Sequence, residues 1–415
     1  MIIFHIDVNS AYLSWQAVYE LENGSSRDLR TLPAIIGGDQ AKRHGIVLAK
    51  SIPAKKQGII TGESLMEARL KCPGLLVIPP NYHLFAQCSQ AMYELLLDYS
   101  PQVQRYSVDE CFLDYTASQR LFGDPEETAH TIRNRIKEEL GFTVNIGISS
   151  NKLLAKMGGE LQKPDQVHTL FPAEIMEKMW PLPVGDLFMV GRATRKKLRR
   201  LNIQTIGQLA NSEPAFLRLH FKSYGTLLWQ YANGIDDSMV RESNFPKQKG
   251  VGNSTTISFD VTDRKEALLV LLSLTEKVAL RMRKKKAFGQ VVAISIKSFR
   301  LERISHQRRL AHPCQSTRAL YEVVESLFDE AWTGIPIRHL GLRISDLTDL
   351  PFEQLSLFDS YDRQKDAVLD ATMDKLRKRY GEKILVRGCF PHSGIKSIQG
   401  GVAENDDYPI MTSLL

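Results

Sequence analysis

The strongest constraint on the fold is a regular alternation of helical and extended patterns between residues 81 and 162. Apolar residues recur there with the helical period in three stretches, separated by short runs rich in β-branched and aromatic residues. The predicted helices span 81–99, 126–140 and 151–162, and the predicted strands, the first of them a strand or hairpin, span 102–115 and 143–149. This alternation predicts an antiparallel or mixed sheet with helices on one face, an α+β layout.

The rest of the chain extends this pattern in both directions. At 415 residues it is too long for one compact core, and roughly three or four domains are expected. Upstream, the patterns predict strands at 1–7, 34–37, 46–49 and 75–78 and helices at 11–22 and 63–71. Downstream, they predict an entirely helical region over 171–238, strands at 291–297 and 338–346, and helices at 264–283, 316–331 and 363–380. The basic segment 241–250, which contains serine and proline, is the predicted linker.

Basic residues outnumber acidic residues and are clustered. Lysine and arginine number 54 against 47 aspartates and glutamates, which gives a net charge of +7 and an isoelectric point near 9.0. The segment 192–200 carries six basic residues and no acid, and the segment 281–286 carries five basic residues out of six. Two separate basic faces indicate a long polyanion such as a nucleic-acid duplex. Ribosomal or membrane-surface binding, or two solvated helix faces, would give a similar pattern.

Cysteine usage and hydropathy indicate the compartment. The five cysteines are far apart and include no C-x-x-C pattern, so neither a disulfide framework nor a zinc ribbon is predicted. The first strand is followed at once by polar residues, and no apolar run of about 18 residues or more is present. We therefore expect a soluble, cytoplasmic protein without a signal peptide or a membrane span.

Three acidic residues lie at the edges of apolar strands. Asp7 ends the first strand, and Asp109 and Glu110 lie inside another. An unpaired charge is costly there, so a cation partner is expected, and oxygen-only ligands suit Mg²⁺. Two such ions about 3.5–4 Å apart can activate an attacking hydroxyl and stabilise a leaving oxygen in phosphoryl transfer. Neighbours in a strand point to opposite faces, so Asp109 and Glu110 can share a site only at a turn or a strong twist. For each acid alone, a solvated or capping carboxylate is the alternative.

Three lysines follow one stripe of the helix predicted at 151–162. Lys152 and Lys156 are four residues apart and Lys163 is seven further on, so at about 100° per residue they lie within roughly 40° of one another. This stripe is suited to a triphosphate, while the opposite, leucine-rich stripe is suited to a core. An ordinary amphipathic surface helix would show the same pattern.

Four motifs resemble those of the Y-family of translesion DNA polymerases. They are DVNSAYLSW at 7–15, YSVDECF at 106–112, GISSNKLLAKMGGELQKP at 147–164 and VGRATRKKLRRLNIQTIGQLA at 190–210. They occur in the family's order and close to its spacing, so the resemblance is very specific. It implies a multidomain right-hand polymerase with a palm, small fingers, a helical thumb and an α/β little finger.

The resemblance also implies domain boundaries, an activity and ligands. The implied domains are a palm at 1–18 and 80–170, fingers at 19–79, a thumb at 171–238, a linker at 239–248, a DNA-binding little finger at 249–348 and a tail at 349–415. The implied activity is template-directed synthesis across damaged DNA with low fidelity and no proofreading. The implied ligands are primer–template DNA, dNTPs and two Mg²⁺ ions, for which Mn²⁺ is a possible substitute.

The motifs carry individual site residues by resemblance. The implied metal ligands are Asp7, Asp109, Glu110 and the backbone carbonyl of Val8. Of these, Asp7 and Asp109 would bridge both ions, and Glu110 would hold the catalytic one. Tyr12 is implied as the steric gate that excludes a 2′-hydroxyl, and Lys163 as a contact of the incoming triphosphate.

The fingers segment departs from the family's pattern. Lys55 stands where the family places a basic residue that contacts the triphosphate. The usual small polar and tyrosine positions are Ala49 and Ile52 here, so part of the triphosphate grip must come from elsewhere, with Lys50 and Ser51 as candidates.

Residues 190–210 resemble a helix-hairpin-helix, whose turn offers backbone N–H groups to phosphates without reading sequence. Candidate DNA contacts in the two basic clusters are Gly191, Arg192, Arg195, Lys196, Arg281, Arg283 and Lys284. The usual first glycine is Met189 here, and Asn202 stands where a second glycine is common. Because methionine tolerates positive φ poorly, a distorted hairpin with a weaker DNA grip is expected. A purely structural hairpin is the alternative.

The tail contains a peptide that resembles the Q-L-x-L-F segment by which bacterial polymerases bind the β sliding clamp. Its matching residues are Gln354, Leu355, Leu357 and Phe358. The two terminal apolar side chains would fill a pocket and the glutamine would bond at its rim, which would tether a weak DNA binder. A stray amphipathic turn is the alternative. The remaining tail resembles the UmuC-type branch more than the polymerase IV branch, so a recombinase or a UmuD-like accessory subunit is a further candidate partner.

Two other functions remain open from the residues alone. Acids and lysines in this arrangement also suit a two-metal nuclease or another phosphotransferase. A catalytically inactive DNA- and clamp-binding scaffold would retain the same fold.

Overall fold

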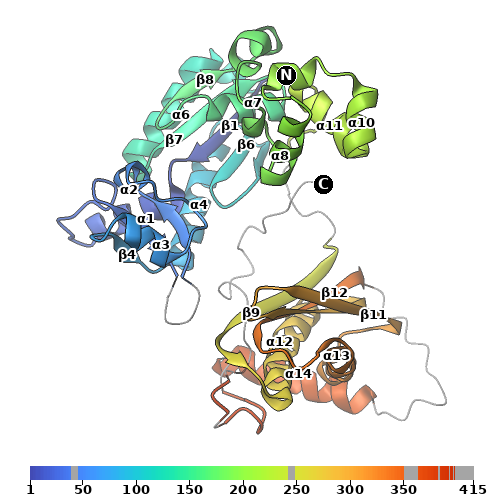
Figure 1. The fold of residues 1–415 in the computed structure, drawn as a ribbon. Coiled ribbons are helices and arrows are strands. Elements are labelled where there is room, and N and C mark those ends of the chain that lie inside the picture. The colour runs from blue at the N-terminus through green and yellow to red at the C-terminus, as the bar shows by residue number, and fades with distance from the viewer. Residues whose placement is uncertain are drawn as a thin grey trace. The chain divides into compact units, whose positions relative to one another are not determined.

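The computed structural model describes residues 1–38, 45–241, 248–349, 363–381, 384–391, 393–395 and 397. The chain forms two compact units (Figure 1). The described part of the first unit ends at residue 241, and the described part of the second unit resumes at residue 248. None of the helices formed by these residues is long and apolar enough to cross a bilayer.

A five-stranded mixed sheet organises the first unit. Its strands in spatial order are β5 (Val103–Arg105), β6 (Glu110–Asp114), β1 (Ile3–Val8), β7 (Val144–Ser149) and β8 (Val167–Thr169). The central strand β1 pairs antiparallel with β6 and β7, and β7 pairs parallel with β8. The predicted α+β layout is therefore confirmed, and the segment 102–115 is a hairpin.

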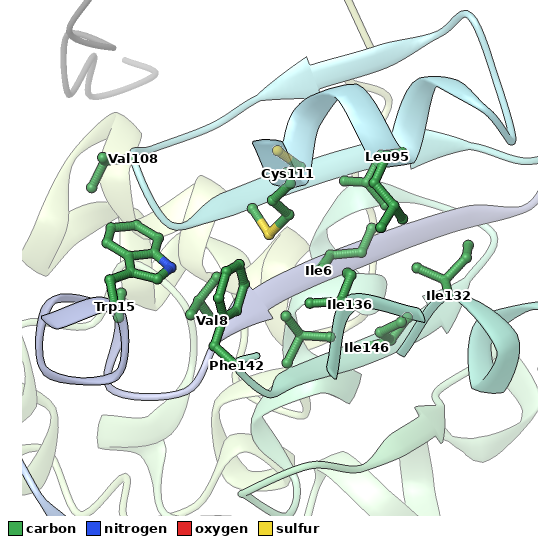
Figure 2. Packing of buried hydrophobic residues seen from close by; sticks show 14 of the residues in the cluster. Ile6, Val8, Trp15, Leu95, Val108, Cys111, Ile132, Ile136, Phe142 and Ile146 are labelled. Carbon is green, nitrogen blue, oxygen red and sulfur yellow. The ribbon is translucent and has the colours of Figure 1, made fainter. Parts of the chain in front are cut away.

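Helices cover both faces of this sheet, so the prediction of helices on one face is wrong. On one face lie α1 (Ala11–Glu22), α4 (Tyr82–Leu97) and α6 (Pro125–Leu140), whose apolar side chains share a core with Ile6 and Val8 (Figure 2). On the other face lies α7 (Lys152–Glu160), so close that a Cβ on Gly147 would come within 1.9 Å of the Ala155 carbonyl oxygen. The reason is visible in β1, since all six of its residues are buried and a strand buried on both faces needs cover on both.

Two smaller bodies complete the first unit. Residues 34–38 and 45–78 include a three-stranded sheet of β3 (Val47–Lys50), β2 (Ala34–Gly37) and β4 (Leu76–Ile78), with α2 (Ile52–Lys56) and α3 (Leu65–Lys71) around a small core of their own. The short α5 (Gln119–Phe122) follows β6, and after β8 short helical turns over 172–186 lead into four helices: α8 (Arg192–Arg200), α9 (Ile206–Ala210), α10 (Pro214–Phe221) and α11 (Ser223–Ala232). The core of these four helices includes Leu153, Leu154 and Met157 of α7, so α7 packs both on the five-stranded sheet and on this helical region.

The second unit contains a four-stranded antiparallel sheet with helices on one side (Figure 1). Its strands in spatial order are β11 (Arg303–Cys314), β10 (Phe288–Ser298), β12 (Ile337–Thr348) and β9 (Gly250–Val261), and its covering helices are α12 (Arg264–Lys284) and α13 (Thr317–Ala331). The predicted strands at 291–297 and 338–346 are the two central strands. The edge strands β9 and β11 were not predicted.

The helix α14 (Arg363–Tyr380) belongs to the second unit. Arg283 of α12 forms ion pairs with Asp370 at 3.1 Å and with Asp374 at 2.6 Å. Arg377 donates to the buried carboxylate of Glu276 at 3.3 Å. The helix predicted at 363–380 is confirmed, and it packs on a folded domain rather than standing apart from it.

Candidate catalytic site

Strand pairing brings the three predicted acids to one end of the first sheet. Asp7 lies opposite Glu110 in the β1–β6 register, and the backbone N–H of Val8 donates to the carbonyl oxygen of Asp109 at 3.0 Å. Asp109 lies in the turn before β6 rather than inside the strand, because the N–H groups of Tyr106 and Ser107 close back onto the Glu110 carbonyl at 2.9 and 3.2 Å. This turn provides the break in strand geometry that a shared site for Asp109 and Glu110 requires.

Each of the three carboxylates has a hydrogen-bond donor. Lys163 Nζ lies 2.5 Å from Asp7 Oδ2, and Ser107 Oγ donates to Asp109 Oδ1 at 2.5 Å. The side chain of Asp7 is 11% exposed, so its ion pair with the lysine is largely shielded from water.

Glu110 has two donors on one carboxylate oxygen. Lys156 Nζ lies 2.5 Å from Glu110 Oε2, and His5 Nε2 lies 3.1 Å from the same atom. The Lys156 ammonium also lies 5.2 Å from the ring centre of Tyr106 and 5.6 Å from that of Phe188, within the range of cation–π attraction.

The acids differ in their charge balance. Burial raises the pKa of Asp7 despite its lysine partner, and burial raises the pKa of Asp109 despite its hydroxyl donor. Burial would also raise the pKa of Glu110, but the hydrogen bond from His5 and the charge of Lys156 outweigh it and lower that pKa to about 2. Burial therefore disfavours the charged forms of Asp7 and Asp109, whereas Glu110 is stabilised as a carboxylate.

The donor set fits a divalent metal in chemistry. Within the described ranges, no three His, Cys, Asp or Glu side chains are grouped so that they could hold a metal ion as they stand. Two of the three acids hold lysines instead. Carboxylate oxygens are the ligands that Mg²⁺ prefers, and burial, which raises the pKa of Asp7 and of Asp109, makes their charged forms costly without a cation partner.

Tyr12 lies in the first turn of α1, five residues after Asp7. Its ring stacks on Phe85 of α4, with ring centres 4.5 Å apart and an interplanar angle of 9°. Tyr82 meets it edge-on at 6.4 Å. The ring of the predicted gate residue is therefore held in place by aromatic neighbours.

The lysine stripe is only partly as predicted. Lys152 is buried and donates to Gln104 Oε1 at 3.1 Å and to the Met239 carbonyl at 3.3 Å, so its amine is directed away from the acids. Lys156 and Lys163 do reach the acids, although α7 ends at residue 160 and Lys163 follows it in a loop. Helical spacing alone therefore misassigned Lys152.

In the fingers segment, Lys55 is exposed on α2. The hydroxyl of Ser51 is buried, donates to the Leu32 carbonyl at 2.7 Å and accepts from two backbone N–H groups, so its predicted role as a triphosphate contact is wrong. Lys50 Nζ donates to Thr61 Oγ1 at 2.9 Å. Burial lowers the pKa of Lys50, and the charge of Lys55 lowers it further, as expected for two nearby cations.

The predicted hairpin is formed with both non-glycine residues in the left-handed conformation. Met189 has φ 75° and Asn202 has φ 61°. Tyr224 Oη donates to the Met189 carbonyl at 2.5 Å, which helps to hold this strained residue. Gly191 is the N-cap of α8, and Arg192, Arg195 and Lys196 are exposed beside it. The predicted weakening of the DNA grip stays a prediction.

The second basic cluster is mostly used within the protein. Arg283 binds two acids of α14, and Arg281 donates to Asn253 Oδ1 at 2.6 Å. Both arginines are thus engaged within the protein, whereas Lys284 is exposed, and the assignment of all three as DNA contacts stays a prediction. The local sequence around Arg283 does not reveal that acids 87 and 91 positions later will pair with it.

Two sets of residues were missed in the sequence. His5 contacts Glu110, and strand alternation offered a signal, since residues 5 and 7 of one strand point to the same face. The second set lies on the face of the four-stranded sheet that is turned away from its helices. Lys297 of β10 and Arg303 of β11 are neighbours in the strand register there, so two basic side chains lie side by side on this face. The predicted clamp residues, Gln354, Leu355, Leu357 and Phe358, lie outside the described residues.

The fold is that of solved Y-family DNA polymerases. A Y-family chimera of Dbh and Dpo4 matches with a TM-score of 0.70 and 20% identity, covering 84% of this chain and 99% of that one. A ternary complex of Dbh matches with a TM-score of 0.56 and 20% identity. These likenesses show the fold class that the sequence predicted, a multidomain α+β arrangement.

Family models and relatives give the particular family. The impB/mucB/samB family model matches residues 6–160, its helix-hairpin-helix (HHH) motif matches 172–203, and its C-terminal domain matches 248–357. The DNA polymerase IV of Clostridium acetobutylicum is 45% identical over 94% of this chain and 98% of its own, and that of Acetivibrio thermocellus is 38% identical over 94% and 97%. The chain belongs to the impB/mucB/samB family of Y-family DNA polymerases.

The predicted family and the predicted enzyme class, a DNA-directed DNA polymerase, are thereby confirmed. These relatives are named DNA polymerase IV and lend no support to the expected likeness of the tail to the UmuC-type branch, which stays a prediction.

Proposed function

We propose that this protein carries out translesion DNA synthesis by two-metal nucleotidyl transfer at Asp7, Asp109 and Glu110. The observation that carries the proposal is the strand register that places Asp7 opposite Glu110 and joins Val8 to Asp109 by a backbone hydrogen bond of 3.0 Å. When bound, Mg²⁺ ions would lower the pKa of the primer 3′-hydroxyl and stabilise the departing pyrophosphate. The relatives named DNA polymerase IV support this activity.

The chain's own residues hold and orient the reactants. The three carboxylates, with the Val8 carbonyl, are the proposed ion ligands. Lys163 now neutralises Asp7, and it lies in a loop beyond α7, from which its flexible side chain can turn to the incoming triphosphate. Lys55 approaches the triphosphate from the fingers. The reaction needs no protein nucleophile, since position and charge neutralisation supply the catalysis.

Selection against ribonucleotides falls to Tyr12. Its ring is stacked flat on Phe85, so it cannot swing aside without losing that contact. A 2′-hydroxyl on the incoming sugar would meet a fixed ring, which supports the gate role.

DNA contacts are proposed on each unit separately. In the first, the exposed basic residues of α8 and the N-terminal end of that helix offer a phosphate site. In the second unit, the sheet face turned away from the helices offers Lys297, Arg303 and Arg343. Small residues such as Ser295 and Gly341 lie between them, which lets a DNA backbone approach this face closely. The predicted palm, fingers, thumb, linker and little finger, at the boundaries given above, remain the proposed domain assignment.

Primer extension tests the proposal. The double variant Asp109→Asn/Glu110→Gln should lose extension of a primer on undamaged and abasic templates while still retaining DNA in a gel-shift assay. The matched control is Asp98→Asn/Glu139→Gln, which removes two exposed acids that pair with Arg135 away from the site and should extend normally. Unchanged extension by the first variant would overturn the assignment, and primer shortening by the wild type would favour a nuclease.

Clamp recruitment is proposed from the Q-L-x-L-F peptide. Substituting Leu357 and Phe358 by alanine should remove stimulation by the β sliding clamp and leave clamp-free extension unchanged. Equal stimulation of both proteins would contradict the proposal. A cytoplasmic location and a recombinase or UmuD-like partner stay predictions.

A further inference from the structure

His5 is a buried polar residue that contacts one of the proposed catalytic acids and that the reaction scheme does not use. It lies on β1, two residues before Asp7, and its side chain is fully buried. Its strand neighbours in register are Phe112 of β6 and Gly147 of β7. A histidine so placed has no access to water and can find hydrogen-bond partners only within the protein.

Among the residues that the structure describes, only one of the two ring nitrogens finds a partner. Nε2 lies 3.1 Å from Glu110 Oε2, and Nδ1 is buried without a hydrogen bond. Since a carboxylate can only accept, Nε2 carries the proton and Nδ1 is the bare lone pair, which costs less to leave unpaired than an N–H group would. The ring is therefore a neutral donor aimed at one oxygen of Glu110.

The pocket around the ring leaves it little freedom. The Phe112 ring centre lies 4.8 Å from that of His5, and a Cβ added to Gly159 of α7 would come within 3.4 Å of Nδ1. The ring is held between a strand and a helix backbone, so the direction of its N–H is fixed by packing rather than by Glu110. Such a donor can impose a conformation on the carboxylate.

We propose that His5 is a positioning residue that fixes the Glu110 carboxylate for divalent-cation binding. With Oε2 held by His5, Glu110 keeps a defined rotamer when Lys156 is displaced, and Oε1 remains for the ion. This inference rests on the proposed metal site. Outer-shell donors of this kind typically contribute about 10- to 100-fold to metal affinity.

Equilibrium binding of Mn²⁺ tests the inference without turnover. Free Mn²⁺ is measured by electron paramagnetic resonance with the full chain, a dideoxy-terminated primer–template and the matching dNTP. The variant His5→Leu should bind Mn²⁺ about 10-fold more weakly. The variant His5→Gln, whose amide N–H can reach Glu110, should recover part of the loss. His168→Phe, a histidine substitution on β8 of the same sheet, is the matched control and should bind like the wild type.

The outcomes separate the inference from the proposed site. If the wild type binds no more Mn²⁺ than Asp109→Asn/Glu110→Gln, the metal site itself is wrong. If the wild type binds more than that variant but His5→Leu binds equally well, only the role of His5 is wrong. Should His5→Leu fail to fold, ¹⁵N-histidine spectra of the wild type decide: the His5 signals, assigned with His5→Gln, should show the Nε2–H tautomer and shift on adding Mg²⁺. The opposite tautomer, or no shift, would overturn the inference.

Discussion

The Nζ atom of Lys163 lies 2.5 Å from Oδ2 of Asp7, although the two residues are 156 positions apart in the sequence. The same amine lies 2.7 Å from Oε1 of Glu160. Burial lowers the pKa of Lys163, but Asp7 and Glu160 outweigh burial and raise that pKa above its ordinary value. Lys163 is therefore a firmly charged cation next to the proposed catalytic centre.

Replacing Lys163 by methionine should raise the KM for dNTP by roughly 10-fold or more, because a charge-assisted hydrogen bond to phosphate contributes about 1.5–3 kcal/mol. The measurement is steady-state single-nucleotide insertion. Lys137→Met is the matched control, since Lys137 pairs with Asp165 at 2.9 Å on the surface and should leave the KM unchanged. A KM for Lys163→Met equal to that of the wild type would show that the lysine serves only Asp7.

Tyr12 should exclude ribonucleotides through its ring and not through its hydroxyl. Tyr12→Ala is expected to incorporate rNTPs readily, whereas Tyr12→Phe should discriminate as the wild type does. Phe85→Leu removes the ring on which Tyr12 stacks and should loosen discrimination to an intermediate degree. Competition between dNTP and rNTP in single insertions measures all three variants. If Tyr12→Phe lost discrimination, the phenol hydroxyl rather than the ring would be the gate.

Two basic residues from the predicted DNA-binding set should behave differently. Lys196 is exposed on α8, so Lys196→Met should weaken DNA binding for all sequences and reduce the salt slope of log K by about 1. Arg283→Met should leave the DNA affinity and its salt slope unchanged, because that guanidinium binds Asp370 and Asp374. Fluorescence anisotropy at several salt concentrations makes the comparison. A reduced slope for Arg283→Met would instead support the DNA contact predicted from the sequence.

The second unit should depend on α14 for stability. Glu276 is 1% exposed, and its carboxylate accepts from Arg377 and Arg387. Arg377→Met should destabilise this unit by about 3 kcal/mol, because it leaves a buried charge with less compensation. Hydrogen exchange of the α12 amides reports the change locally.

Two variants test the cause of this effect. Lys378→Met, on the exposed side of the same helix, should change stability by no more than about 0.5 kcal/mol. Adding Glu276→Met to Arg377→Met should recover much of the loss, because a buried pair can be replaced by apolar side chains at little cost. Without such recovery, the effect would come from the Leu385 carbonyl, which Arg377 also binds at 2.9 Å.

The sequence by itself determined the helices and strands whose buried side chains form a regular apolar pattern. The apolar run of β1, the helical periods of α1, α4, α6 and α12, and the helical region after residue 171 were predicted within a few residues. The edge strands β9 and β11 were missed because one face of each is open and the pairing with β12 and β10 is made by backbone groups, which leave no apolar pattern. The motifs also named the three acids and the family, since their order and spacing are specific.

Only the tertiary structure decided which partners these residues meet. Lys152 and Lys156 share a helical stripe, yet one turns to Gln104 and the other to Glu110. Arg283 lies in a basic cluster from which a DNA contact was predicted, whereas in the structure it forms ion pairs with two acids of α14. The physical reason is that periodicity fixes the face on which a side chain lies, whereas an ion pair or hydrogen bond depends on distances between elements that are far apart in the chain.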